Sequence, residues 1–336
     1  MKYFLTLLIA AVIIAGPHAY ARDLDIAISA GVERYSGYTL YQIGGKFTAP
    51  DGSEGNYQFP LSELKFPLDV YMMYFGAEAA IFRRIVLRLG IETNTAGGFI
   101  DFSKNAGKME DSDWGIWFIQ GYPWARYDSL DIFSRSSAEL DGVILDSAAG
   151  IELYRSGMIS FTIGAGFLYQ YFDYVVRDLD QWYPSYEEYS AYLPPEYAGN
   201  DLVPGRVITY EVKYRIPYAE ASISLRPLKR LSLWSRIAFS PLVSSDDVDD
   251  HLLRSKLSKG SAQGSAVIFN IEAECRIRGN WSAGLYSRFI YMVTEGNQDQ
   301  SFYEDTPEGP EGPIGTIENR LESHQLSTGI MIEYSF

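Results

Sequence analysis

The stretch Leu326–Phe336, which reads LSTGIMIEYSF, decides the fold class of this chain. Bulky side chains occupy most of every second position, and small or polar side chains fill most of the positions between them. Because successive side chains of an extended strand point to opposite faces, this alternation indicates a β-strand with one apolar face. The residues on that face are Leu326, Thr328, Ile330, Ile332, Tyr334 and Phe336.

The same period of two recurs in the segments 159–169, 267–277 and 281–293. On the face opposite its apolar set, the second of these segments carries Glu272 and Glu274. A charged inner face would be unusual in a soluble sandwich, but it is ordinary in a barrel whose apolar outer face meets lipid. No stretch beyond the N-terminus has the length of a membrane helix, and a closed β-barrel is the other architecture that satisfies its backbone in lipid.

The alternating segments predict an all-β fold: a closed antiparallel transmembrane β-barrel of ten strands with five long extracellular loops. Short turns alternate with long connections, as in the outer-membrane barrels of bacteria. The expected strands lie near 24–42, 63–80, 84–97, 138–154, 158–177, 206–226, 230–245, 264–278, 281–296 and 322–336. The expected long loops are 43–62, 98–137, 178–205, 246–263 and 297–321.

The apolar residues of one segment change phase at Pro217. Tyr214 and Ile216 precede the proline at even positions, whereas Ala221 and Ile223 follow it at odd positions. A change of phase by one residue at a proline predicts a β-bulge in this strand.

The N-terminal residues 1–21, MKYFLTLLIAAVIIAGPHAYA, have the pattern of a secretory signal. Lys2 supplies the positive start, Phe4–Ala15 the apolar core, and Ala19–Ala21 a small-residue cleavage site. The alternative is an uncleaved anchor, but the apolar core is short for a membrane span of about 20 residues. We therefore expect residues 1–21 to be removed and residues 22–336 to form the barrel.

The composition excludes several classes of protein. Lys and Arg number 28 against 43 Asp and Glu, a net charge of −15, so we expect no nucleic-acid partner, because a phosphate backbone requires a basic face. Cys275 is the single cysteine, which excludes an internal disulfide. The 26 tyrosines suggest girdles at the membrane interfaces, and we place the tyrosines of 169–197 there.

Two acidic motifs lie in expected loops. Asp111-Ser112-Asp113-Trp114 falls in 98–137, and Asp246-Asp247-Val248-Asp249-Asp250-His251 falls in 246–263. A histidine beside an acid can take a proton near neutral pH, and an Asp two positions away can orient its ring. From the residues alone two other interpretations stay open: solvated surface acids, or a calcium site, although neither motif has the spacing of an EF-hand loop.

Three stretches together resemble the omptin family of outer-membrane aspartyl-type proteases. Met109–Trp114 is similar to the family's Asp-x-Asp-Trp motif between strands three and four. Val243–His251 is similar to the Ser-Ser-Asp and Asp-x-Asp-x-His stretch between strands seven and eight, with one residue inserted. Lys213–Tyr218 resembles the basic, Pro-Tyr-containing sixth strand.

The resemblance implies an endopeptidase in the cell outer membrane, with its active site facing outside and extracellular polypeptides as substrates. The implied catalytic residues are Asp111, Asp113, Asp249 and His251, which activate a water molecule without a serine or cysteine nucleophile. It implies neither a cofactor nor a metal, and we expect a monomer. The alternatives are a catalytically inactive barrel that serves as an adhesin or receptor, and a passive porin, which a narrow ten-stranded lumen disfavours.

The resemblance also implies substrate and lipid contacts, with two departures. Specificity for basic residues rests on two acids in the family; Asp247 matches one, but Tyr41 stands where the other is expected. Lipopolysaccharide binding is implied through Lys213, but Asp173 stands where an Arg is expected. We therefore expect cleavage near basic residues and only doubtful dependence on lipopolysaccharide.

Overall fold

A computed structural model describes residues 24–82, 84–94, 102–115, 129–186 and 199–336, so the expected signal at 1–21 lies outside the described residues. No helix in these ranges is long and apolar enough to cross a bilayer. The elements are β1 (Leu24–Thr48), β2 (Glu54–Asn56), β3 (Ser62–Pro67), β4 (Val70–Ile81), β5 (Ile85–Thr93), β6 (Asn105–Trp114), β7 (Leu130–Arg155), β8 (Ile159–Trp182), β9 (Asp201–Leu228), β10 (Leu231–His251), η2 (Leu252–Arg254), β11 (Lys256–Arg278), β12 (Trp281–Phe302) and β13 (Gly312–Ser335).

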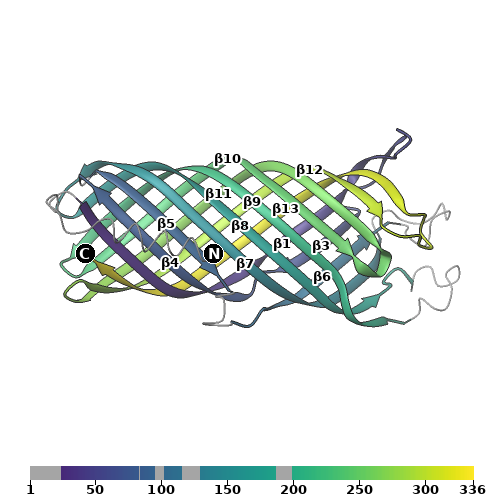
Figure 1. The fold of residues 1–336 in the computed structure, drawn as a ribbon, viewed down its shortest axis with the longest axis horizontal. Helices are drawn as coiled ribbons and strands as arrows, with labels where there is room; N and C mark the ends of the chain where they lie inside the picture. The colour runs from purple at the N-terminus through teal and green to yellow at the C-terminus, as the bar shows by residue number, and fades with distance from the viewer. Residues whose placement is uncertain (1–23, 83, 95–101, 116–128, 187–198) are drawn as a thin grey trace.

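The strands form one sheet that closes into a tilted barrel (Figure 1). All neighbours are antiparallel, and the ring closes where β1 pairs with β13, from Ala27↔Ser335 to Thr48↔Thr316. β2 is a short addition to β1, while β3 with β4, and β5 with β6, each make one interrupted strand of the wall. Counted in this way, the wall has the ten strands that the alternation predicts, and the expected fold is confirmed.

The expected loops are shorter than the sequence suggests, because the strands run far past the lipid-facing zone. Much of the described part of 98–137 belongs to β6 and β7, and 246–263 is strand except around the single turn η2. The two acidic motifs therefore lie on strands and not in loops. Polar residues on both faces hide the alternation in these extensions, which is why the sequence suggests loops there.

The expected bulge at Pro217 is wrong. The pairing of β9 with β8 runs through Pro217 without a shift, and even-numbered residues stay inward on both sides of it, as buried Tyr214 and Glu220 show. The apolar residues change phase because they change face. Before Pro217 they point into the lumen, and beyond it they lie on the outward face, as Ile223, which is 40% exposed, shows. The irregularity lies on the neighbouring strand, β10, between Phe239 and Ser244.

An apolar belt covers the part of the wall nearest the short turns. The outward positions predicted in the last strands are confirmed, and Cys275 is exposed among them. On five strands, the exposed large apolar residues that lie farthest from the short turns are Phe167 on β8, Leu242 on β10, Val267 on β11, Phe289 on β12 and Leu326 on β13. This belt marks the lipid-facing zone, and the strands continue well beyond it.

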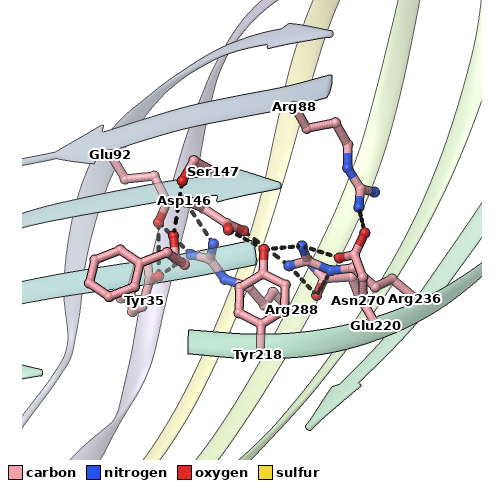
Figure 2. Close-up of polar contacts among 11 residues, drawn as sticks. Tyr35, Arg88, Glu92, Asp146, Ser147, Tyr218, Glu220, Arg236, Asn270 and Arg288 are labelled. Atoms are coloured by element: carbon pink, nitrogen blue, oxygen red, sulfur yellow. Dashed lines mark hydrogen bonds and ion pairs between the residues drawn. The ribbon is translucent and has the colours of Figure 1, made fainter. Parts of the chain in front are cut away.

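At the level of the belt, a network of charged groups fills the lumen (Figure 2). Arg236 donates hydrogen bonds to Asp146 at 3.1 Å, to Glu220 at 3.2 Å and to the Asn270 side chain. A second arginine of the lumen, Arg288, donates to Glu92 at 2.8 Å in the same view. Because these charges are buried, each needs a partner, and the arrangement supplies one.

A layer of aromatic side chains lies in the lumen between this network and the far end. The rings of Phe66 and Tyr210 stack with centroids 4.3 Å apart, and the rings of Tyr41 and Tyr174 lie 5.4 and 6.3 Å from that of Tyr210. Tyr174 was expected in an outer girdle, but it is fully buried inside. We call this layer the aromatic floor; the acidic residues of the far end lie beyond it.

Candidate active site

An extra residue in β10 turns its acidic motif toward the lumen. Before the irregularity, the buried residues of β10 have even numbers, and after it they have odd numbers. The register with β11 shifts between Ser240 and Val243, which is the signature of a bulge. As a result Asp247 and Asp249, each 2% exposed, face inward, and His251 follows on the same face.

The second acidic motif lies on β6. Asp111 and Asp113 are on the same face as Met109, which is fully buried, because side chains alternate along the strand. Asp113 lies opposite Ser62 of β3, whose side chain hydrogen-bonds to it. Both acids are thus held on a paired strand beyond the apolar belt.

The electrostatics show that the two motifs face each other. Burial raises the pKa of Asp111 well above its usual range, and the charges of Asp113 and Asp249 raise it further. Burial also raises the pKa of Asp113, whereas the hydrogen bond with Ser62 and the charge of His251 act in the opposite direction. Because such effects fall off with distance, the acids of β6 lie near the residues of β10 across the lumen, and we call the space between them the cleft.

Within the cleft, Asp249 and His251 form a hydrogen-bonded pair. The distance from Oδ2 of Asp249 to Nε2 of His251 is 2.9 Å. The other carboxylate oxygen of Asp249, Oδ1, is buried and accepts no hydrogen bond from the described residues, and the same holds for Oδ1 of Asp111. Buried acceptors of this kind can bind a donor that enters the cleft.

Asp247 lies between the aromatic floor and the Asp249–His251 pair. Burial raises the pKa of Asp247 to about 8, with Asp249 adding to the effect. Asn319 donates a long hydrogen bond of 3.5 Å to Oδ1 of Asp247. Tyr41, which stands where the resemblance suggests a second acid, is 3% exposed and feels the charges of Asp249 and Asp247. The structure thus places Tyr41 beside both acids.

Three residues of this region were missed by the sequence analysis. A Cβ on Gly260 would lie 2.2 Å from Oδ1 of Asp247, so the carboxylate takes the space of a missing side chain. Two cations, Arg254 and Lys256, lie within the five residues that follow His251, and their charges act on Asp113. For these two cations the available signal in the sequence was their nearness to His251.

Lys213 lies apart from the cleft, on the outer wall. Its ammonium pairs with Glu211 and lies 5.5 Å from the centre of the Tyr171 ring. Asp173 is next to it, opposite Glu211 in the register. His324 is also outside the cleft: its Nε2 lies 2.9 Å from Glu322.

Among the described residues, no group of three or more histidine, cysteine, aspartate or glutamate side chains is arranged to hold a metal ion. Fold and site together define a class: a membrane-spanning β-barrel with an acidic, histidine-containing cleft beyond its lipid-facing belt.

Comparison with known proteins assigns the family. The sequence model of the Omptin family matches residues 88–336, so the chain belongs to the omptin family of outer-membrane proteases, as its motifs suggest. It is accordingly a protease, a hydrolase of peptide bonds, and its membrane is the outer membrane. No curated protein sequence matches the chain.

A solved structure agrees with this fold. The crystal structure of the outer membrane protease OmpT from Escherichia coli is similar, with a TM-score of 0.69 and 16% identity, over 96% of this chain and 99% of that one. The translocator domain of the autotransporter NalP from Neisseria meningitidis is more distant, with a TM-score of 0.36 and 8% identity over 100% of this chain and 95% of that one.

Proposed function

We propose that this protease cleaves extracellular polypeptides in the cleft between β6 and β10, which faces the outside of the cell. The observation that carries the proposal is the hydrogen-bonded Asp249–His251 pair, set opposite the half-buried acids Asp111 and Asp113. A base held by one acid and facing a pair of acids is suited to activating water against a carbonyl.

In the proposed mechanism, His251 takes a proton from water as the water attacks the scissile carbonyl. Asp249 orients the ring through Nε2 and stabilises its charged form. A positioned base of this kind contributes about 10²–10⁴ in rate. Asp111 and Asp113 lie close together with raised pKa values and share a proton, and the protonated member donates a hydrogen bond to the developing oxyanion.

Substrate preference is proposed to depend on Asp247, which would bind the basic side chain of the residue that precedes the scissile bond. Tyr41 occupies the neighbouring position and contributes no charge there at neutral pH. A single acid with a pKa of about 8 binds a guanidinium less firmly than two ionised acids do. We therefore propose a moderate preference for basic residues.

Other parts of the proposal concern the chain's surroundings. Residues 1–21 are removed on export, and the barrel works as a monomer. Lipopolysaccharide phosphates would meet Lys213 on the outer wall, but its ammonium already pairs with Glu211 and Asp173 stands beside it, so we propose that activity does not depend on this lipid.

Peptide cleavage by the refolded barrel tests the function. Wild type, Asp111→Ala, His251→Ala and the matched control His324→Ala are incubated with a fluorogenic peptide library. We expect a loss of about 10² or more in kcat/KM for the two cleft variants. The control should match wild type, because His324 is on the outer wall.

Two results would count against the proposal. Wild-type turnover by His251→Ala would remove this residue from the mechanism. No turnover in any sample, alongside an active omptin in the same assay, would favour the adhesin or receptor alternative.

A further inference from the structure

Lys256 is a buried cation that faces the candidate base. It is the first residue of β11 and lies directly opposite His251 in the register with β10. Directly opposed residues of antiparallel strands put their side chains on the same face, with Cβ atoms roughly 5 Å apart. Lys256 is only 7% exposed, and buried Ser258 and Gly260 continue the inward face of β11. Its ammonium therefore shares the cleft with the imidazole.

Acids surround His251 on several elements. Asp249 and Asp250 lie on β10, Asp113 lies on β6, and Glu308 lies in the connection from β12 to β13. Each negative charge favours the protonated imidazolium. An imidazole that is already protonated cannot accept a proton from water, so acids alone would disable the base.

Two cations oppose these acids, and one of them is already engaged. Arg254 of η2 donates two hydrogen bonds to Glu308, at 2.7 and 2.5 Å, which offsets its charge locally. The side chain of Lys256 makes no ion pair or hydrogen bond with the described residues, and its charge acts on Asp249 and Asp113 through space. Among the described residues, Lys256 is thus the cation next to His251 whose ammonium forms no direct ion pair.

We propose that Lys256 is a positioning residue whose ammonium keeps the imidazole of His251 neutral, and so able to act as a base, at neutral pH. The catalytic consequence rests on the proposed function, whereas the coupling between the two side chains does not. Burial lowers the pKa of Lys256 to about 8, so the ammonium is mostly charged at neutral pH and becomes neutral in more alkaline solution.

The two histidines of the barrel allow a direct test by NMR. Once residues 1–21 are absent, His251 and His324 are the only histidines, and each lies 2.9 Å from a carboxylate. With labelled imidazoles in the refolded barrel, each ring is titrated separately. The measured quantity is the change in the His251 midpoint when Lys256 is substituted, with His324 as the internal reference.

Substitutions of Lys256 then test whether its positive charge acts on His251. Lys256→Met should move the titration midpoint of His251 up by about one pH unit, since a nearby unit charge has an effect of this order. Lys256→Arg keeps the charge and should restore the wild-type midpoint. Lys259→Met, three residues along the same strand on the exposed face, should change nothing. The His324 midpoint should be the same in every variant, which also reports correct folding.

Kinetics give the second readout. In Lys256→Met the acidic limb of kcat/KM against pH should move to higher pH by the same amount as the His251 midpoint, with activity recovering above it. A merely structural role would lower activity at every pH without moving the limb.

The outcomes are separable. An unchanged His251 midpoint in Lys256→Met overturns the inference. If that variant does not fold, Lys256→Gln removes the same charge but keeps a polar side chain, and an unchanged His251 midpoint in Lys256→Gln overturns the inference as well. If wild type cleaves no peptide, the proposed function fails, while the NMR titration still decides the coupling.

Discussion

Asp247 is an acid whose charge changes in mildly alkaline solution. It is 2% exposed, and burial raises its pKa to about 8. A carboxyl with a raised pKa is neutral below that value and ionised above it. Its attraction for a basic side chain must therefore grow as the pH rises through 8.

This predicts a pH-dependent preference at the residue scale. Between pH 7 and pH 9, the ratio of kcat/KM for an arginine peptide to that for its neutral citrulline counterpart should rise by about tenfold, because an ionised carboxylate binds guanidinium more firmly. The ratio cancels the titration of the catalytic groups, which both peptides share. Asp247→Asn should give a flat ratio, and a flat ratio in wild type would contradict the role of Asp247.

Gly260 supports the same acid from across the hairpin. A Cβ at Gly260 would come within 2.2 Å of Oδ1 of Asp247 and 2.6 Å of Nδ2 of Asn319. We expect Gly260→Ala to lower kcat/KM for arginine peptides more than for citrulline peptides, because it displaces the carboxylate. Gly55, where a Cβ meets nothing within 4 Å, supplies the control substitution to Ala. Equal losses for both peptides would show that the substitution does not act through Asp247.

At the scale of the element, the bulge in β10 decides which residues of its acidic motif face the lumen. The strand uses one more residue than β11 between Ser240 and Val243. If the same sequence ran on without a bulge, even-numbered residues would continue inward, and Asp246 and Asp250 would face the lumen. Deleting the extra residue removes the bulge instead, so the residues from Val243 onward keep their present partners and faces. Removing a residue from the regular part beyond it would instead reverse every following side chain.

Two deletions test this difference. Deletion of Leu242, within the bulge, should leave Asp247, Asp249 and His251 inward and kcat/KM within about tenfold of wild type. Deletion of Val248 should turn Asp249 and His251 outward and abolish the contribution of the base, about 10² or more. Both variants are compared by cleavage of one peptide after refolding is verified. Similar activity in the two would contradict the assigned register.

At the scale of the whole molecule, charge is distributed unevenly. The net charge is −15, and exposed acids gather at the far end of the barrel, as at Asp51, Asp299, Asp305 and Glu311. A field of this sign attracts cationic peptides to the cleft and is screened by salt over about 10 Å at 0.1 M.

Salt should therefore act on the encounter with basic substrates. Between about 20 and 500 mM NaCl, kcat/KM for a peptide with several lysines should fall several-fold, whereas that for an uncharged peptide should change little. The measurement compares slopes of kcat/KM against ionic strength at constant detergent. Equal slopes for the two peptides would show that the field does not guide association.

The wall of the barrel was predictable because its signal is local. Alternation along segments such as 267–277 and Leu326–Phe336 depends only on neighbouring residues, and it is confirmed by the exposed faces of β11 and β13. The motifs at Asp111–Trp114 and Asp246–His251 were also visible. Their placement in loops was wrong, because strand extensions outside lipid lose the apolar signal on which the prediction rests.

The sequence by itself determined the fold class, the family and the residues with suitable chemistry, because alternation and short motifs are properties of adjacent residues. Only the tertiary structure decided that β6 and β10 meet across one cleft, that Tyr174 and Tyr210 fill the lumen, and that Lys256 lies beside His251. These contacts depend on closure of the ring and on the bulge, which bring together residues far apart along the chain. Burial then shifts the pKa values of those residues and so sets their charges.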